Sequence, residues 1–548
     1  MHRYAMYNTR RSLHQPRSFR SGMTWRCCVL GLMALSACGH MRTGSAARAI
    51  DQDLALAASF PAHVGAPQAP RAPLASPLSP QHPFMAPRGA SNMHVDSFTS
   101  NTYAWRGPLG HAPEVASRSM GLVGGECPTI NFDKRGRIVT LCVRQRSPSL
   151  LLLDAESLTV LARYDLPTRR TPLFRLRKMM NDTSGGAYFY LDHKGRAVLG
   201  TADGAIEIVA LRDDAQGLRF EREERIELAS ALALADGSRD KVTAVLPDFQ
   251  GNLWFVARYG TIGLITPERA IHTLRFAGEE VENSFSIGPE ATYVVSDHAL
   301  YRLEQDSAGK PRVIWRERYD RGQHRKVGQI NQGSGTTPTL LGTDYVAIGD
   351  NAEPRMNVIV MRRDALAERR IVCKQAVFAA GKSATENTFI GYQRSLIVEN
   401  NAGYDLFTTM RGGKTSAPGI ARIDVRADES GCDVVWESEE ISQTTVPKLS
   451  TETGLVYLYT KLPNAPHGAD AYYFTALDFH TGRTVYQVLT GTGVRYDNNW
   501  AAISLAPDGT AFVGVLNGLI RVRDSVPVLP LPAAPKSPLA APLLALTP

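Results

Sequence analysis

Short apolar runs rich in Val, Ile, Tyr, Phe and Leu alternate with polar turns through the body of the chain, roughly from Ser97 to Asp524. Runs of this kind, bounded by Gly, Asp and Asn, are typical of β-strands, and few stretches show the spacing of an amphipathic helix. The pattern recurs with a loose unit of about 50 residues, which is the period of propeller blades. The chain is therefore predicted to be all-β and to fold as a β-propeller.

Four of the predicted hairpins share a turn in which Asp comes first and Gly follows. Asp bonds to nearby backbone and Gly accepts a positive φ, so two strands reverse tightly. These turns are Asp133–Arg137, Asp192–Arg196, Asp248–Asn252 and Pro507–Thr510. The repeats start near residues 126, 183, 242, 284, 336, 387, 445 and 500, which predicts eight blades. Seven is the alternative, because the unit at 242 is short, and a strand from Ser97 to Gly110 is expected to close the ring.

The N-terminal segment predicts export. Six arginines and no acidic residue precede Cys38, and the apolar run Cys27–Leu35 is too short to span a bilayer permanently. The run closes on Leu35-Ser36-Ala37-Cys38, which resembles the lipobox of bacterial lipoproteins. The resemblance implies a signal peptide over residues 1–37 and a lipid on Cys38. An ordinary cleaved signal, or a chance Cys, is the alternative, and Met23 is a second candidate start.

Two proline-rich stretches flank the predicted propeller. Prolines recur from Pro61 to Pro87 among Ala, Ser and Gln, a composition that favours extended, solvated chain. Residues 38–96 are therefore predicted to be a lipidated N-terminus and flexible tether, residues 97–524 the propeller, and residues 525–548 a disordered Pro/Ala-rich tail. Gly39 after the lipidation site is compatible with the outer membrane, so the propeller is expected to face the periplasm.

Charge and cysteine content narrow the partners. The formal net charge is +8, and removal of the six arginines before Cys38 leaves about +2. With no basic stripe interleaved with aromatic residues, a nucleic-acid partner is not expected. Four cysteines follow Cys38, an even number that fits an oxidising compartment. Three pairings are possible; a hairpin would bring Cys127 to Cys142 and leave Cys373 with Cys432, and buried free thiols are the alternative.

One repeat resembles a known family. Phe474–Val485 contains Ala-x-Asp at a strand end, then Thr-Gly, then a further strand, and resembles the repeat of the quinoprotein (PQQ-dependent) alcohol dehydrogenase-like propellers. Leu152–Val160 is a degenerate copy. The resemblance implies blade architecture, and only weakly the quinone, because other repeats have lost both Asp and Gly. Trp254 and Trp500 are the tryptophans near inner strands, and no assembled PQQ site is predicted around them.

The loops that enter the innermost strands carry polar residues at matching positions of the repeat. In a propeller these loops meet at one mouth of the axial channel. The residues are Glu126, Asn181–Asp182, Glu282–Asn283, Thr336–Pro338, Glu386–Asn387, Thr444–Pro447 and Asn498–Asn499. A second set follows the next strand: Asp297–His298, Asp350–Asn351 and Glu399–Asn401. These side chains either cap turns around a wet channel or hold a ligand.

Carboxylate and amide oxygens around one axis are the ligands that Ca²⁺ prefers. The arrangement resembles, by position only, the gluconolactonase and paraoxonase-like propellers, in which Glu and Asn hold a catalytic calcium. The candidate metal ligands are Glu282, Asn283, Glu386, Asn387, Glu399 and Asn400. A small organic ligand held by the same groups without metal is a further alternative.

Three functions follow from these observations. The first is a noncatalytic envelope module that binds a protein partner or small molecule at the mouth, since the fold needs no catalytic residues for this. The second is a Ca²⁺-dependent hydrolase of lactones or esters, and the third is a PQQ-dependent oxidoreductase. His298 and His480 are candidate general bases for an enzyme, because their unperturbed pKa lies nearest neutrality.

Overall fold

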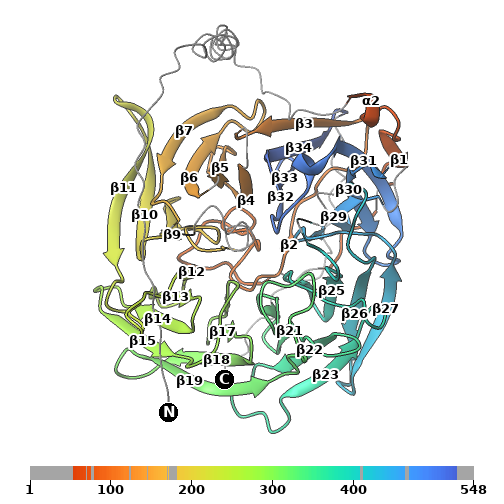
Figure 1. Cartoon of the computed structure of the whole chain (residues 1–548). Coiled ribbons are helices and arrows are strands. Elements are labelled where there is room, and N and C mark those ends of the chain that lie inside the picture. The colour runs from red at the N-terminus through yellow and green to blue at the C-terminus, as the bar shows by residue number, and fades with distance from the viewer. Residues whose placement is uncertain are drawn as a thin grey trace, which may run out of the picture. The chain divides into compact units, whose positions relative to one another are not determined.

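Seven four-stranded antiparallel sheets and one six-stranded sheet surround a central axis in a ring among the described residues (Figure 1). The computed structural model describes residues 54–69, 71–75, 79–121, 125–144, 146–169, 171, 182–405, 407, 412–462 and 468–526. Within these residues the strands form eight sheets, which confirms an eight-bladed β-propeller. The predicted signal segment, Cys38 and the tail beyond residue 526 lie outside them.

Each blade is made of consecutive strands, and the first strand of each lies nearest the axis. Blade one is β4 to β7 (Glu126–Phe132, Ile138–Arg144, Ser147–Leu153, Val160–Asp165) and blade two is β8 to β11 (Tyr190–Leu191, Ala197–Gly200, Ala205–Asp214, Gly217–Glu227). Blade three is β12 to β15 (Val242–Pro247, Leu253–Ala257, Thr261–Ile265, Ile271–Arg275) and blade four is β16 to β19 (Ser286–Ile287, Thr292–Val295, Ala299–Gln305, Pro311–Arg318).

The second half of the ring repeats this order. Blade five is β20 to β23 (Thr339–Leu341, Tyr345–Gly349, Asn357–Arg362, Ile371–Ala376) and blade six is β24 to β27 (Ile390–Tyr392, Ser395–Glu399, Ile420–Val425, Cys432–Ser438). Blade seven is β28 to β31 (Lys448–Ser450, Leu455–Lys461, Ala471–Asp478, Thr484–Thr492) and blade eight holds β32 to β34 (Ile503–Leu505, Ala511–Val515, Gly518–Asp524). The short helices α2 (Leu54–Ala57) and η2 (Val494–Tyr496) lie outside the sheets.

The Asp-Gly turns form where the sequence predicts them. In blade one the Asp133 carboxylate accepts hydrogen bonds from the backbone amides of Arg135 and Arg137, both at 2.9 Å. Gly136 has a φ of 74°, a conformation that favours glycine. The turns at Asp192 and Asp248 have the same backbone contacts. This local chemistry sets the register between the first two strands of blades one, two and three.

An N-terminal strand closes the ring, as predicted, but its position differs. Strand β3 (Pro113–Ser119) pairs antiparallel with β34, from Pro113 opposite Asp524 to Ser119 opposite Gly518. The predicted closing segment, Ser97 to Gly110, contributes only β2 (Thr102–Tyr103), which pairs in parallel with β28. Blade eight therefore joins the two ends of the propeller chain, because β3 pairs with the outer side of β34.

Residues Ser91–Tyr103, here called the axial segment, lie inside the ring and are all buried. Its backbone carbonyls accept hydrogen bonds from the first strands of successive blades. The donors are the amides of Leu191, Ile287, Leu340, Gly391 and Leu449, at 2.7 to 3.0 Å. In Figure 1 this segment is the orange trace that crosses the centre of the ring. Met93 of this segment also packs against Val446 and Ala502, in the loops that enter β28 and β32, so the segment extends to the entry side of the first strands.

The structure departs here from the predicted flexible tether over residues 38–96. In the described part of that segment, β1 (His63–Gly65) pairs with β31 of blade seven, and the Leu74 amide donates to Thr451 O at 2.7 Å. The prolines keep the chain extended, and its carbonyls and amides bond to the propeller. Composition alone did not distinguish an extended chain in solvent from an extended chain bound to a surface.

Two disulfides are present, with the pairing suggested by hairpin geometry. Cys127 and Cys142 join β4 to β5 within blade one, and Cys373 and Cys432 join β23 of blade five to β27 of blade six. The second bond therefore links the outer strands of adjacent blades.

Candidate functional site at the channel mouth

The loops that enter the first strands form one end of the axial channel, here called the mouth. Three of these loops are linked by hydrogen bonds. The Tyr188 hydroxyl, just before β8, donates to Asn283 Oδ1 at 3.0 Å, and Asn283 Nδ2 donates to Gly335 O. The carboxyl group of Glu386 packs directly against Gly335, where any side chain would collide with it. Blades two, four, five and six thus meet around Glu386.

Glu386 is the least compensated charge at the mouth. Its side chain is buried, and within the described part of the chain neither carboxylate oxygen has a hydrogen-bond partner. Burial, together with the nearby Glu282 carboxylate, raises the pKa of Glu386 well above its usual value. The Ile330 backbone and the charges of Arg258 and Arg325 offset only part of this effect.

Glu282 differs because it has a cationic partner. Arg258, in the turn after β13, forms an ion pair with Glu282 Oε1, and Glu282 Oε2 has no partner among the described residues. Burial raises the pKa of Glu282 to about 7, and Arg258 counteracts the rise. Glu282 and Glu386 are therefore two neighbouring buried acids, and Arg258 forms its ion pair with Glu282.

The six predicted metal ligands do not form one ligand set. Glu282, Asn283 and Glu386 gather as described, whereas Asn387 Nδ2 donates to Glu399 Oε1 within blade six. Asn400 ties loops together: Oδ1 accepts from the Ala384 and Ala402 amides, and Nδ2 donates to two backbone carbonyls. Sequence position placed these residues near the axis, and their hydrogen bonds give them separate roles.

The acids that a calcium ion needs are not grouped among the described residues. Ca²⁺ takes six to eight oxygens, several from carboxylates. Among the described residues there is no group of three or more His, Cys, Asp or Glu side chains close enough to hold a metal ion. The amide oxygens of Asn283 and Asn400 are already hydrogen-bond acceptors. The carboxylates instead occur singly or in pairs around the ring.

Two further acids are buried around the axis. Burial raises the pKa of Glu126 to about 8, and Asn499 Nδ2 donates to its Oε2 at 3.3 Å. Burial also raises the pKa of Glu399 to about 8, opposed by its hydrogen bonds and by the charge of Lys448. One oxygen of each, Glu126 Oε1 and Glu399 Oε2, has no partner in the part of the chain that is described.

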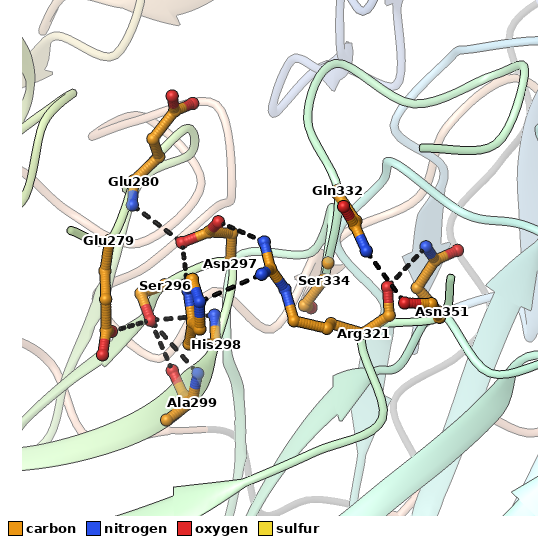
Figure 2. A network of polar contacts seen from close by, with 12 residues as sticks. Glu279, Glu280, Ser296, Asp297, His298, Ala299, Arg321, Gln332, Ser334 and Asn351 are labelled. Atoms are coloured by element: carbon orange, nitrogen blue, oxygen red, sulfur yellow. Dashed lines mark hydrogen bonds and ion pairs between the residues drawn. The ribbon is translucent and has the colours of Figure 1, made fainter. Parts of the chain in front are cut away.

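A polar network outside the mouth fixes the loop that carries Gly335. Figure 2 shows Arg321 reaching Asp297 Oδ2, at 2.7 Å, and His298 Nε2, at 3.0 Å. Asp297 Oδ1 contacts His298 Nδ1 and accepts the Glu280 amide. Asn351 Nδ2 donates to Arg321 O at 2.9 Å. The network joins the loop between blades four and five to both of those blades.

The network also decides the role of the candidate histidines. Both ring nitrogens of His298 have partners, so neither is free to accept a proton from a substrate. The backbone of His480 belongs to the Asp478 turn, and its ring packs edge-on against Phe479. Neither lies in the group around Glu386.

The tryptophans considered for a quinone site have structural roles. The Trp254 indole is buried and donates to Asp248 Oδ2 at 2.9 Å, so it anchors the turn of blade three. Trp500 packs edge-on against Tyr404.

Sequence reasoning missed Tyr188, Arg258 and Arg321. Tyr188 occupies the strand-entry position of blade two, which had been assigned to Asn181–Asp182. The loop before β8 is longer than its counterparts, so a fixed repeat length shifted the alignment by several residues. The signal that marks it is the aromatic Tyr188-Phe189-Tyr190 run that leads into β8. Arg258 and Arg321 lie in loops without repeat-specific spacing.

Comparison with known proteins adds little beyond the fold. No protein-family profile matches the chain. An uncharacterized protein of Archaeoglobus fulgidus is 25% identical over 341 residues, which cover 56% of this chain and 65% of that protein. A streptogramin B lyase structure covers 75% of this chain and 97% of its own, with 11% identity and a TM-score of 0.38. The WD40 propeller of Doa1 covers 60% and 88%, with 11% identity and a TM-score of 0.32. These likenesses assign no activity to the chain.

Proposed function

We propose that this protein is a noncatalytic binding module of the cell envelope, exported and lipid-anchored through Cys38, which binds a small molecule or protein partner at the channel mouth. The observation that carries this proposal is the meeting of four blades around Glu386, a buried carboxyl group without a described hydrogen-bond partner. A buried polar group costs free energy unless it is paired, so such a group is retained where a ligand completes it.

The asymmetry of the channel supports the mouth as the binding surface. The axial segment lies within the ring, and its carbonyls are bonded to the first strands of five blades. The strand-entry loops carry the unpaired acids instead. Binding therefore needs no opening of the ring.

Cell-envelope placement is supported by the N-terminal sequence and by the two disulfides. Disulfides persist in oxidising compartments such as the periplasm, and this chain has two that join neighbouring strands and blades. No helix among the described residues is long and apolar enough to cross a membrane. In this proposal the lipid on Cys38 provides the attachment.

Binding at the mouth is tested with the chain from Gly39 onward, so that the axial segment is kept. A library of metabolites is screened by thermal shift, and each hit is repeated with Asn283→Leu, which breaks the link between Tyr188 and Gly335. We expect hits that raise the melting temperature of the wild type, lose the effect in the variant, and are recovered chemically unchanged. Hits that are converted to products, or that bind both proteins equally, contradict the proposal.

The anchor is tested separately in a bacterial host. Wild-type protein is expected in the detergent phase after phase partitioning, and Cys38→Ala in the aqueous phase. Wild type that partitions into water without detergent contradicts the lipid anchor and leaves the binding proposal intact.

A further inference from the structure

We propose that the mouth recognises an organic cation, a primary ammonium or guanidinium group, and that Glu386 is the residue that binds it. This inference rests on the proposed function, because it names the chemical class of the ligand at that site. It follows from the kind of atoms left unpaired there, from their charge, and from the way the surrounding groups are already used.

The unpaired atoms at the mouth are hydrogen-bond acceptors. Within the described residues, both oxygens of Glu386, Oε2 of Glu282 and Oδ1 of Asn331 are buried and have no partner. Asn331 follows Ile330, whose backbone lies beside the Glu386 carboxyl group. An amide oxygen can only accept, and so can the carboxylate in its ionised form, so a ligand that binds this form must donate several hydrogen bonds. Ammonium groups have three N–H donors and guanidinium groups have five.

The charges around Glu386 also favour a cation. Arg258 is held by Glu282 and lies 3.5 Å from Glu280, so its charge is shared between two acids. Arg325 donates to the carbonyl oxygen of Gln329. A buried carboxylate without its own counterion is strongly destabilised, and an incoming cation supplies that counterion.

An organic cation fits this arrangement better than a metal ion. A metal requires several ligating side chains around one point, and the described residues contain no such group of acids, histidines or cysteines. An N–H donor needs only individual acceptors at hydrogen-bond distance. The Tyr188 hydroxyl and the Asn283 amide are occupied with each other and with Gly335, so they shape the site without competing for the cation.

The same arrangement couples binding to a proton. Glu282, Arg258, Arg325 and Tyr188 are the titratable groups that face Glu386 from the neighbouring loops. Because burial raises the pKa of Glu386, a proton competes with the cation for this carboxylate. Affinity for the cation should therefore rise as the pH rises from 6 to 8, where a neutral ligand would show no such dependence.

The test uses 1,5-diaminopentane and butylguanidinium as probes, with CaCl₂ and 1-pentanol as comparisons, in calorimetric titrations of the chain from Gly39 onward. We expect at least one organic cation to bind, with affinity about tenfold higher at pH 8 than at pH 6. Glu386→Gln keeps the shape and removes the charge, and should weaken binding at least tenfold. Glu268→Gln removes an exposed acid from a turn of blade three and should change nothing.

Folding of the variants is checked by their melting temperatures, and Glu282→Gln is a second probe of the same site. A Glu282→Gln protein that folds should also bind the cation more weakly. The inference is overturned if Ca²⁺ binds through Glu386 and the organic cations do not, if Glu386→Gln binds as well as wild type, or if no probe binds. Neutral hits from the library screen that are sensitive to Asn283→Leu would preserve the proposed function while rejecting this inference.

Discussion

The axial segment and the mouth belong to the same channel, and their buried charged groups are treated in opposite ways. At the axial segment, the buried Lys448 ammonium donates to Met93 O at 2.9 Å and to Asn101 Oδ1 at 2.6 Å. At the mouth, the buried Glu386 carboxyl group has no described partner. A paired buried charge fixes structure, whereas an unpaired one is costly to the fold alone. The difference separates a structural part of the channel from the part for which we propose ligand binding.

The largest effect is expected when Lys448, which donates to the axial segment, is removed. Lys448→Ala leaves two buried acceptors of the axial segment without a donor, and we expect a loss of about 3–5 kcal/mol in the free energy of unfolding. Urea denaturation followed by tryptophan fluorescence measures this loss. Lys134→Ala, at an exposed turn position of blade one, is the control and should lie within about 0.5 kcal/mol of wild type. Equal stability of the two variants would mean that Lys448 does not secure the axial segment.

The next effect concerns the covalent link beside the mouth. Cys127, next to Glu126, is joined to Cys142 across a separation of 15 residues. Replacing both with Ser should cost about 2–3 kcal/mol, since the bond restricts the unfolded chain. Differential scanning calorimetry with and without reductant measures the loss. If the double variant melts at the wild-type temperature under oxidising conditions, the strand pairing alone holds blade one.

The blades and the channel differ in how well the sequence predicts them. The blades follow from local rules: Asp133 and Gly136 set a turn, and apolar runs set the strands around it. The repeat starts predicted at 126, 242 and 284 lie within two residues of β4, β12 and β16. Such features depend on residues that are close in the sequence, so they can be predicted from it.

The axial segment and the site depend on contacts between distant residues. Nothing near Met93 or Asn101 in the sequence indicates that Lys448, about 350 positions away, donates to both. Likewise Glu282, Asn283 and Glu386 were found by repeat position. Asn387 shares that position and Asn400 belongs to the second set, yet their side chains bond to Glu399 and to backbone carbonyls. The repeat tells which residues approach the axis, and the hydrogen bonds decide which of them remain available.

A smaller effect is expected in the pH dependence of stability, through the buried acid Glu126. Burial raises the pKa of Glu126 to about 8, above its value in the unfolded chain. A raised pKa means that the folded state holds the proton more tightly, so this contribution to stability is full below about pH 4.5 and is lost as pH rises through 8. Glu126→Gln should therefore lose less stability than wild type between pH 5 and 8.5. Parallel melting curves for the two proteins would contradict the burial of a neutral Glu126.

The smallest effect tests whether the outer network positions the mouth. Arg321 contacts Asp297 and His298 at a partly exposed site, so Arg321→Ala should cost only about 1 kcal/mol in stability. Its loop also carries Gly335, against which Glu386 packs. We therefore expect cation affinity to fall by about fivefold, at nearly unchanged stability, because a loosened loop must be ordered again on binding. The calorimetric titration that detects the organic cation measures this, with Arg312→Ala on β19 as the control. A wild-type affinity in Arg321→Ala would show that the mouth keeps its shape without this network. The contact between Gly335 and Glu386 would then be sufficient to position the carboxyl group.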